Sequence, residues 1–411
     1  MKSERMLKTI GISSIPKGWE WKRIDECFDI VKRKNDNNSE NILTISSLSG
    51  FVNQKERFSK VIAGDNLKKY TLLRKGEFSY NKGNSKTFPC GCIFLLEDYE
   101  EAAVPNVYIS FKNKNEISNK FYRYYFQNRL LDGQLKRLIN TGVRNDGLLN
   151  INTDEFCGVY ILVPPIKEQE KISEILSTWD LAIDKQQQLI EKKKEFKKGL
   201  MQILLSGEVR FKGFKDSWQK VKLENVSSCF AGGTPSTQND EFWGGENIWL
   251  QSGRVQNCEI KMLDDEIKIT NLGLKKSAAK LIKPKSVLIA LTGATCGNIA
   301  YIDFEACSNQ SIVAIEPNER VDYKYLYYKL MSERKQILTK QNGSAQGGIN
   351  LSIVKKIMID IPCIKEQVRI GEILQAVDKE VELLEKELEA LKLQKKGLMQ
   401  RLLTGEVRVK V

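Results

Sequence analysis

Two groups of polar side chains, in loops that contain glycine, have the chemistry that reading nucleic-acid bases requires. Arginine, lysine, asparagine and glutamine supply paired donors and acceptors for base edges, and nearby cations bind phosphates. The DNA-binding candidates are Lys82, Asn84, Ser85, Lys86, Arg144 and Asn145 in the first half of the chain, and Thr234, Ser236, Gln251, Ser252, Arg254 and Gln346 in the second. Any single one of these residues is more often simply a solvated loop residue. The prediction therefore depends on several of them occurring together in the same loops.

Catalytic signatures are missing from the sequence. The chain has no histidine, which excludes a histidine base, a histidine-containing triad and a histidine metal site. It has no G-x-x-x-x-G-K-[ST] phosphate loop, and Val163-Pro164-Pro165-Ile166 lacks the flanking residues of a methyltransferase motif. Asp264-Asp265-Glu266-Ile267-Lys268 resembles a nuclease cluster only faintly. We therefore predict a non-catalytic chain with no catalytic residue, metal or cofactor of its own.

The charge balance indicates an anionic partner. Lysine and arginine number 65 against 52 aspartates and glutamates, which gives a formal net charge of +13. Nucleic acid is the commonest partner of such a surface, and a lysine-rich proteome is the plainer alternative. The nine cysteines form no C-x-x-C pair and predict reduced thiols in the cytoplasm. No apolar stretch is long enough to span a membrane, and the polar first nine residues predict that the chain is not exported.

The sequence of the elements that must position these loops occurs twice in the chain. Pro164 to Arg210 returns as Pro362 to Arg408, at an offset of 198 residues without a gap. Both copies begin with P-x-I-K-E-Q and end with G-L-M-Q-x-L-L-x-G-E-V-R, whereas their middles differ. Trp19 and Trp218 begin the two preceding regions 199 residues apart. The chain is therefore predicted to consist of two similar halves, each ending in the same long element.

Both long elements are predicted to be α-helices that pair as a coiled coil. In the second copy, apolar residues recur in steps of four and three from Ile370 to Leu402, which is a heptad seam. The first copy keeps this frame but has polar residues at Gln186, Lys193 and Lys197. Its middle is basic where that of the second copy is acidic, and antiparallel packing would bring residue 190 near residue 384. Parallel packing in register would also bring these stretches close, so the charges alone do not settle the direction. Each helix follows its own globular region, and two such halves related by pseudo-twofold symmetry require an antiparallel pair, which we therefore expect.

The two regions before the helices are predicted to be α/β domains. Short runs of β-forming residues between glycine, asparagine and proline indicate strands, and residues 119–139 and 322–340 have helical periodicity. We predict an α+β protein with two similar α/β domains at residues 1–163 and 214–361. The helices and their linker occupy residues 164–213 and 362–411.

The pattern resembles the DNA-specificity subunits of type I restriction–modification enzymes. The resemblance spans roughly Ile15 to Lys410. It depends on the repeated helix ends, on Gly232-Gly233-Thr234-Pro235-Ser236, and on Leu291-Thr292-Gly293-Ala294-Thr295 with Asn309-Gln310. It also includes the linker that begins Gly207-Glu208-Val209-Arg210. The first region lacks the G-G-T-P-S loop of the second, so the two halves are expected to read different sequences.

The resemblance implies a function and a set of partners. Each variable region would read one half of a split site in double-stranded DNA, and the helices would space the regions and dock two modification (methyltransferase) subunits. Those partners would bind S-adenosylmethionine and methylate adenine, and restriction (motor and nuclease) subunits could join. The repeated ends predict two equivalent docking sites, with candidates Lys167, Glu168, Gln169, Met201, Gln202, Lys365, Glu366, Gln367, Met399 and Gln400. The alternatives are a specificity subunit of another restriction–methylation system and a coiled-coil adaptor that binds only proteins.

Overall fold

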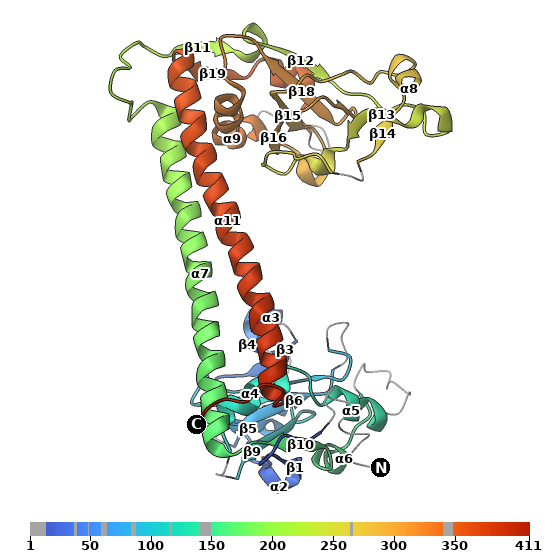
Figure 1. The fold of residues 1–411 in the computed structure, drawn as a ribbon, viewed down its shortest axis with the longest axis vertical. Helices are drawn as coiled ribbons and strands as arrows, with labels where there is room; N and C mark the ends of the chain where they lie inside the picture. Colours follow the sequence, from blue (N-terminus) through green and yellow to red (C-terminus); the bar gives the residue numbers. More distant parts are fainter. Residues whose placement is uncertain are drawn as a thin grey trace. The chain divides into compact units, whose positions relative to one another are not determined.

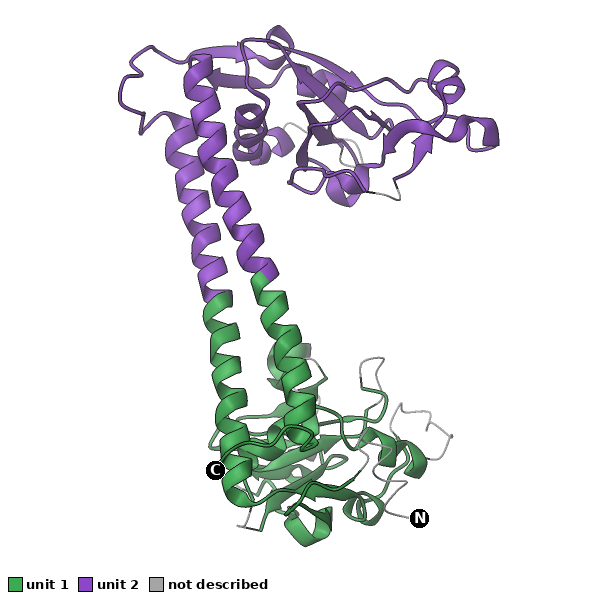
Figure 2. Ribbon diagram, viewed as in Figure 1, with its two compact units in different colours: residues 1–186, 387–411 green, residues 187–386 purple. Residues whose placement is uncertain are grey.

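A computed structural model describes residues 14–36, 39–47, 49–58, 64–83, 88–114, 117–139, 149–263, 266–339 and 348–411 (Figure 1). The chain divides into two compact units (Figure 2). Unit 1 contains residues 1–186 and 387–411, and unit 2 contains residues 187–386. Each unit therefore combines one globular region with parts of both long helices.

The globular region of unit 1 is built on a four-stranded antiparallel sheet. Its strand order is β2 (Phe28–Ile30), β9 (Ile109–Asn113), β6 (Phe78–Asn81) and β7 (Cys92–Leu95). Three antiparallel pairs accompany it: β1 (Glu20–Arg23) with β10 (Tyr160–Val163), β3 (Leu43–Ser46) with β4 (Gly50–Asn53), and β5 (Thr71–Arg74) with β8 (Glu101–Val104). The short helices are α2 (Ile24–Cys27), α3 (Gln54–Phe58), η1 (Gly64–Lys69) and α6 (Thr153–Cys157).

The predicted helix over residues 119–139 is in fact two helices. Ser118 caps the first, α4 (Asn119–Gln127), by accepting a hydrogen bond from the Phe121 amide. Arg129 then has a positive φ of 60°, a conformation that a continuing right-handed helix does not allow. A second helix, α5 (Asp132–Leu138), follows. The single-helix prediction was wrong because the periodicity of apolar residues does not reveal that one residue adopts a left-handed backbone conformation.

Unit 2 has a similar plan with different sheets. The main sheet is antiparallel in the order β12 (Ser227–Ala231), β18 (Ile312–Pro317), β15 (Ser286–Ala290) and β16 (Ile299–Ile302). A second sheet has the order β14 (Lys268–Ile269), β13 (Trp243–Leu250) and β17 (Cys307–Ser308), and β11 (Gln219–Lys222) pairs with β19 (Met358–Ile361). The helices are α8 (Asn271–Lys275), α9 (Tyr323–Thr339) and α10 (Leu351–Lys355), with short turns η2 (Leu223–Asn225), η3 (Asp240–Phe242), η4 (Ser252–Arg254) and η5 (Gly293–Thr295). The helix predicted at residues 322–340 is confirmed as α9.

Strand β15 is buried on both faces, which explains its unbroken apolar sequence. Val287 and Ile289 pack in the core that contains α9, whereas Leu288 and Ala290 pack in a separate core with β13. Successive side chains of a strand point to opposite faces. The sheet of unit 2 therefore separates two cores, and its loops must emerge at the strand ends.

The two long helices are α7 (Ile166–Ser206) and α11 (Ile364–Leu403). In unit 1, Gln186 donates a hydrogen bond to Glu387 over 3.1 Å; in unit 2, Lys193 pairs with Glu380 at 2.6 Å. Residue numbers rise along one helix as they fall along the other, so the helices run antiparallel in each unit. The heptad frame and the antiparallel pairing are thereby confirmed. The polar frame positions of α7 face acidic residues of α11, which accounts for their departure from the apolar pattern.

Candidate nucleic-acid interface and repeated helix ends

Four loops of unit 2 meet at one end of its sheet. The Gly233 amide donates to the Ser308 carbonyl over 2.8 Å, which joins the loop after β12 to the turn before β18. The Asn309 amide donates to Leu250 over 3.0 Å, which adds the end of β13. The Leu291 amide donates to Ser311 over 2.8 Å, which adds the end of β15. We call these four segments (residues 232–238, 250–254, 291–295 and 308–311) the loop edge.

Two glycines permit the close approach of these loops. A Cβ atom on Gly232 would lie 2.2 Å from the carbonyl oxygen of Ser308, and one on Gly233 would lie 2.3 Å from the carbonyl carbon of Ala278. Only a residue without a Cβ atom fits such contacts. The glycines of the Gly232-Gly233-Thr234-Pro235-Ser236 motif therefore pack inward, and Thr234 and Ser236 are exposed.

The loop edge presents a row of neutral hydrogen-bonding groups. Thr234 donates to the Oε1 atom of Gln310 over 2.6 Å, and both residues are exposed. Gln251 is also exposed, while Ser252 is half-buried and its carbonyl accepts from Thr295 over 3.2 Å. The structure thus brings Thr234, Gln251 and Ser252 to one edge, as expected of a shared binding surface. Gln310 was absent from the predicted candidates, and its position within the Asn309-Gln310 motif was the signal that could have identified it.

Arg254 has an internal role. Its Nη2 atom donates to Glu266 over 2.6 Å and to the Lys261 carbonyl over 2.8 Å. Glu266 is largely buried, with its side chain 7% exposed. The ion pair therefore joins two residues of the same connection between β13 and β14. The Nη2 atom of Arg254 therefore has a carboxylate and a carbonyl partner within unit 2, and base reading by Arg254 stays a prediction.

A lysine-rich segment adjoins the loop edge and was also absent from the predicted candidates. Ala278 contacts Gly233 of the loop edge, and exposed lysines lie on either side of it in the sequence. These are Lys268, Lys275, Lys276, Lys280, Lys283 and Lys285. Six lysines within 18 residues were the sequence signal. Lys283 and Lys285 precede β15, at the end of the sheet opposite to the loop edge, and Lys283 contacts Glu316. The lysines nearer Ala278 are exposed ammonium groups suited to binding phosphates.

In unit 1, the residues that flank the two predicted loops lie side by side. The Leu149 amide donates to the Lys82 carbonyl over 2.9 Å, and the Lys82 ammonium donates to the Ile151 carbonyl over 3.4 Å. The segments that lead into the two loops are therefore bonded to each other. The candidates Asn84, Ser85, Lys86, Arg144, Asn145 and Gln346 lie outside the described residues. The segment after Gln346 begins at the loop edge of unit 2, because the Ile349 amide donates to the Leu291 carbonyl.

The repeated helix ends form two ion pairs of the same kind. In unit 1, Glu168 at the start of α7 pairs with Arg408, which follows α11, and also accepts from the indole of Trp19 over 3.0 Å. In unit 2, Glu366 at the start of α11 pairs with Arg210, which follows α7, over 2.7 and 3.0 Å. We call the two pairs the clasps. Each joins the beginning of one helix to the segment after the other.

The glutamines beside these carboxylates attach the helix starts to the globular regions. The Gln169 amide donates to the Pro164 carbonyl over 2.7 Å and accepts from the Ser118 amide over 2.8 Å. Gln367 makes the same pair of bonds, to the Pro362 carbonyl over 2.9 Å and from the Asp322 amide over 3.0 Å. The bonds from the Ser118 and Asp322 amides fix the beginnings of α4 and α9 on the long helices. The repeated glutamine is thus an attachment point.

Burial divides the predicted docking residues into two groups. Glu168, Gln169, Glu366 and Gln367 are between 0 and 5% exposed, and their polar atoms are used internally. These four leave no side-chain surface for a partner. The exposed residues are Lys167, Gln202, Lys365 and Gln400, and Met201 and Met399 are half-buried. Only these six remain docking candidates.

Metal and membrane chemistry have no support in the described ranges. Among them, no group of three or more cysteine, aspartate or glutamate side chains is arranged to hold a metal ion. No helix of the described residues is both long and apolar enough to cross a membrane. Of the segment with faint nuclease resemblance, Asp264 and Asp265 lie outside the described residues and Glu266 pairs with Arg254.

Comparisons with known proteins agree on one family. Residues 16–193 and 215–393 each match the family model described as "Type I restriction modification DNA specificity domain". The type I restriction enzyme MjaVIII specificity subunit of Methanocaldococcus jannaschii is 24% identical over 96% of this chain and 94% of its own length. The EcoR124I/EcoR124II specificity subunit of Escherichia coli is 29% identical over 41% of this chain and 42% of its own. A solved S subunit from M. genitalium shares the fold, with a TM-score of 0.55 and 16% identity over 93% of this chain and 96% of its own.

Proposed function

Because the chain belongs to the family of type I restriction–modification DNA specificity domains, we propose that it is the sequence-specific DNA-binding subunit of such an enzyme. Each globular region would read one half of a bipartite target in double-stranded DNA. The observation that carries this proposal is the loop edge of unit 2, where exposed Thr234, Gln251 and Gln310 adjoin an exposed lysine-rich segment. Neutral donors and acceptors read bases, and lysines bind the flanking phosphates.

The repeated helix ends support docking of two copies of one partner. Lys167 and Gln202 on α7 have exact counterparts in Lys365 and Gln400 on α11, and all four are exposed. Lys167 and Gln400 belong to unit 1, and Lys365 and Gln202 belong to unit 2, so each unit carries one copy of both repeated ends. We propose that the partners are modification (methyltransferase) subunits, which would bring S-adenosylmethionine and the methylation chemistry. Restriction subunits would join through the same complex.

A DNA-binding measurement separates this proposal from the protein-only adaptor. The complex of this chain with its methyltransferase subunit is titrated onto duplex DNA over a range of salt concentrations. Neutralised phosphates make the logarithm of the binding constant fall linearly and steeply with the logarithm of salt concentration. Binding that is indifferent to salt, or no binding in the presence of the partner, would refute the proposal and favour the adaptor.

Methylome sequencing tests the division of labour between the globular regions. Residues 15–155 are replaced by the corresponding region of another family member in a host that also carries the methyltransferase subunit. One half of the methylated motif is expected to change and the other half to stay the same. A motif that changes in both halves, or in neither, would contradict the proposal.

The two long helices are proposed to set the spacing of the half-sites. Deleting one heptad from both α7 and α11 shortens each by roughly 10 Å. Base pairs follow one another at about 3.4 Å, so the spacer of the methylated motif is expected to lose about three base pairs. An unchanged spacer would contradict this role of the helices.

A further inference from the structure

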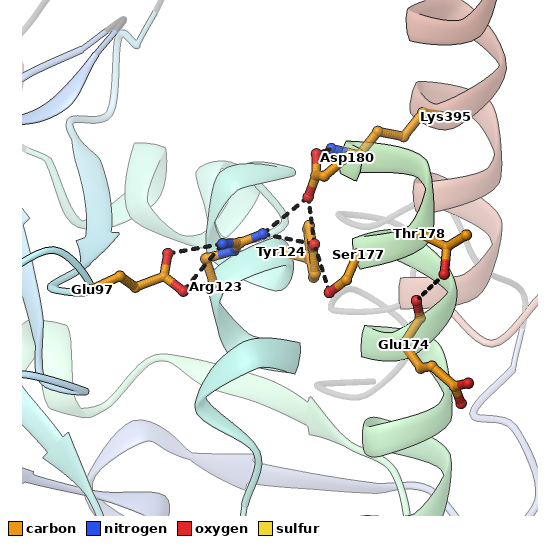
Figure 3. A network of polar contacts seen from close by, with 8 residues as sticks. All are labelled: Glu97, Arg123, Tyr124, Glu174, Ser177, Thr178, Asp180 and Lys395. Atoms are coloured by element: carbon orange, nitrogen blue, oxygen red, sulfur yellow. Dashed lines mark hydrogen bonds and ion pairs between the residues drawn. The ribbon is translucent and has the colours of Figure 1, made fainter. Parts of the chain in front are cut away.

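A polar network joins three helices in unit 1. The carboxylate of Asp180 on α7 accepts from the Tyr124 hydroxyl of α4 over 2.5 Å and from Arg123 over 3.0 Å (Figure 3). The same carboxylate pairs with Lys395 of α11. The ammonium group of Lys395 also lies 5.4 Å from the centre of the Tyr124 ring, within the range of a cation–π contact. The globular region is thus bonded to both long helices through one carboxylate.

Unit 2 contains the same network with the two long helices exchanged. Asp378 of α11 accepts from the Tyr328 hydroxyl of α9 over 2.6 Å and pairs with Lys197 of α7. The Lys197 ammonium group lies 5.6 Å from the centre of the Tyr328 ring. We call the pair of networks the junctions. The aspartates differ by the 198 positions of the repeat, as do the lysines.

The surroundings of the two junctions are also alike. Each tyrosine is 1% exposed. The side chains of Lys395 and Asp180 are 18% and 33% exposed, and those of Lys197 and Asp378 are 17% and 33% exposed. A buried hydroxyl needs a hydrogen-bond partner, and a hydrogen bond to a charged acceptor is stronger than a neutral one. Burial, together with the bond to Asp180, raises the pKa of Tyr124 to about 12, so its hydroxyl remains a donor.

Each junction is a second polar attachment point between a globular region and the long helix that follows it; in unit 2, Tyr301 with Gln375 and Lys261 with Glu382 also join that region to α11. The first is the glutamine at the helix start, Gln169 or Gln367. Asp180 follows Gln169 by 11 residues, and Asp378 follows Gln367 by 11 residues, which is about 16 Å along a helix. The buried apolar cores also join each globular region to its helix, and a second polar attachment at this distance adds to what fixes the angle between them.

From this geometry we propose that Asp180 and Asp378, each with its tyrosine and lysine, are positioning residues that restrict the spacer length the protein accepts between its half-sites. The inference rests on the proposed DNA-binding function. The hydroxyl groups of Tyr124 and Tyr328 are bonded to the long helices and are not part of the loop edge, so the proposal gives the junctions no part in the choice of bases. A region that pivots would still recognise its own half-site, but it would accept that half-site over a wider range of separations.

The two junctions differ in the further bonds made to their aspartates, and this difference predicts an asymmetry. Arg123 gives Asp180 a second bond from α4, and it is itself held by Glu97 over 2.8 and 3.1 Å (Figure 3). The corresponding residue before Tyr328 is Tyr327, which carries no charge. Loss of the tyrosine hydroxyl in unit 1 therefore leaves Arg123 on Asp180. The same loss in unit 2 removes the hydroxyl donor that α9 supplies to Asp378.

The test compares two kinds of Tyr→Phe change in the full chain. The junction variants are Tyr124→Phe and Tyr328→Phe, singly and together. The matched controls are Tyr122→Phe and Tyr325→Phe. Their buried hydroxyls donate to the Leu162 carbonyl over 3.0 Å and to the Asp360 carbonyl over 2.6 Å, within their own globular regions. Every single variant loses one buried hydroxyl, but only the junction variants lose a bond to a long helix.

Each variant is produced with its methyltransferase subunit in a host without other methylation, and the methylated motif is read by methylome sequencing. The expected result for Tyr328→Phe is methylation at motifs with a spacer one base pair longer or shorter, with discrimination reduced about tenfold and the bases of both half-sites unchanged. Tyr124→Phe should have a smaller effect, and the controls should keep the wild-type spacer.

Two results would overturn the inference: a wild-type spacer profile in the double junction variant, or equal relaxation in the controls. Asp378→Asn provides a second variant that keeps the size of the side chain and removes its charge, and it should relax the spacer as well. A wild-type complex that methylates no bipartite motif would instead refute the proposed function. The two failures are therefore distinguishable.

Discussion

Arg210 and Glu366 are 156 positions apart in the sequence, yet the guanidinium group contacts both oxygens of the carboxylate, at 3.0 and 2.7 Å. Glu366 is 1% exposed. The pair between Arg408 and Glu168, 240 positions apart, repeats this arrangement. The motif that begins each long helix is therefore completed by the motif that ends the other.

The clasp predicts that Arg210→Ala destabilises the protein. The change leaves the Glu366 carboxylate buried without its cation, which is among the costly kinds of substitution. Thermal unfolding followed by circular dichroism measures the effect. Arg401→Ala is the control, because Arg401 and Glu406 form a pair with side chains 56% and 60% exposed, and such pairs contribute at most about 1 kcal/mol. An equal loss of stability in both variants would contradict a structural role for the clasp.

The junction of unit 2 predicts a charge-swap rescue. Lys197→Asp and Asp378→Lys are each expected to destabilise the protein, because each places two like charges together between α7 and α11. The double variant restores opposite charges, and the coupling energy should be of the order of 0.5–3 kcal/mol. Denaturant unfolding of the four proteins gives this value. The more exposed pair of Lys193 and Glu380 serves as the comparison, and its coupling energy should be smaller. If the effects of Lys197→Asp and Asp378→Lys on the free energy of unfolding were additive, the contact would be disproved.

Two leucines of α11 test the heptad assignment. Leu374 is 0% exposed and belongs to the core of unit 2, whereas Leu383 on the same helix is 60% exposed. Leu374→Ala removes a fully buried side chain and is expected to cost about 2–5 kcal/mol. Leu383→Ala should change stability by no more than about 0.5 kcal/mol. Comparable losses on denaturant unfolding would mean that the buried face of α11 is assigned incorrectly.

Buried tyrosines predict a loss of stability in alkali. Burial raises the pKa of Tyr124 and Tyr323 to about 12, and it raises the pKa of Tyr80, Tyr125, Tyr325, Tyr327 and Tyr328 further. Unfolded tyrosine releases its proton near pH 10. Between about pH 10 and pH 12 the unfolded chain therefore binds fewer protons than the folded chain, and the free energy of unfolding falls as the pH rises.

Ultraviolet absorbance of tyrosinate, recorded together with circular dichroism, measures this alkaline transition. The buried tyrosines should ionise in the same cooperative step in which the helical signal disappears. Gradual ionisation before any loss of helix would show that these hydroxyls are accessible in the folded protein.

The loop edge and the lysine segment predict two different effects on DNA binding. Gln251→Ala or Gln310→Ala should relax the bases accepted in one half of the motif, since an amide side chain reads base edges. Lys280→Ala should weaken binding to all sequences alike and lower the salt slope by about one. Binding to a panel of duplexes at several salt concentrations distinguishes these effects. The control is Lys335→Ala, because Lys335 is an exposed residue of α9. A base-specific effect of Lys280→Ala would contradict the assignment of Lys280 to phosphate binding.

Much of the architecture followed from the sequence because it is encoded in local periodicity. The gap-free repeat predicted two similar halves, and the steps of four and three predicted the two long helices. The basic and acidic middles of the copies predicted that the two helices pair, and the position of each helix after its own globular region predicted that they run antiparallel. A heptad seam and a charge pattern are properties of residues that are close in sequence, so no tertiary information was needed to recognise them.

Only the tertiary structure decided what individual polar residues do. The repeated Glu-Gln of the helix starts had the features of a docking motif, but Glu168 and Gln169 are buried because Arg408 and Ser118 reach them from distant parts of the chain. Arg254 had the features of a base reader, and the structure shows that its Nη2 atom also donates to the carboxylate of Glu266. Whether a polar side chain faces solvent or an internal partner depends on contacts between residues far apart in sequence. Neither periodicity nor composition records those contacts.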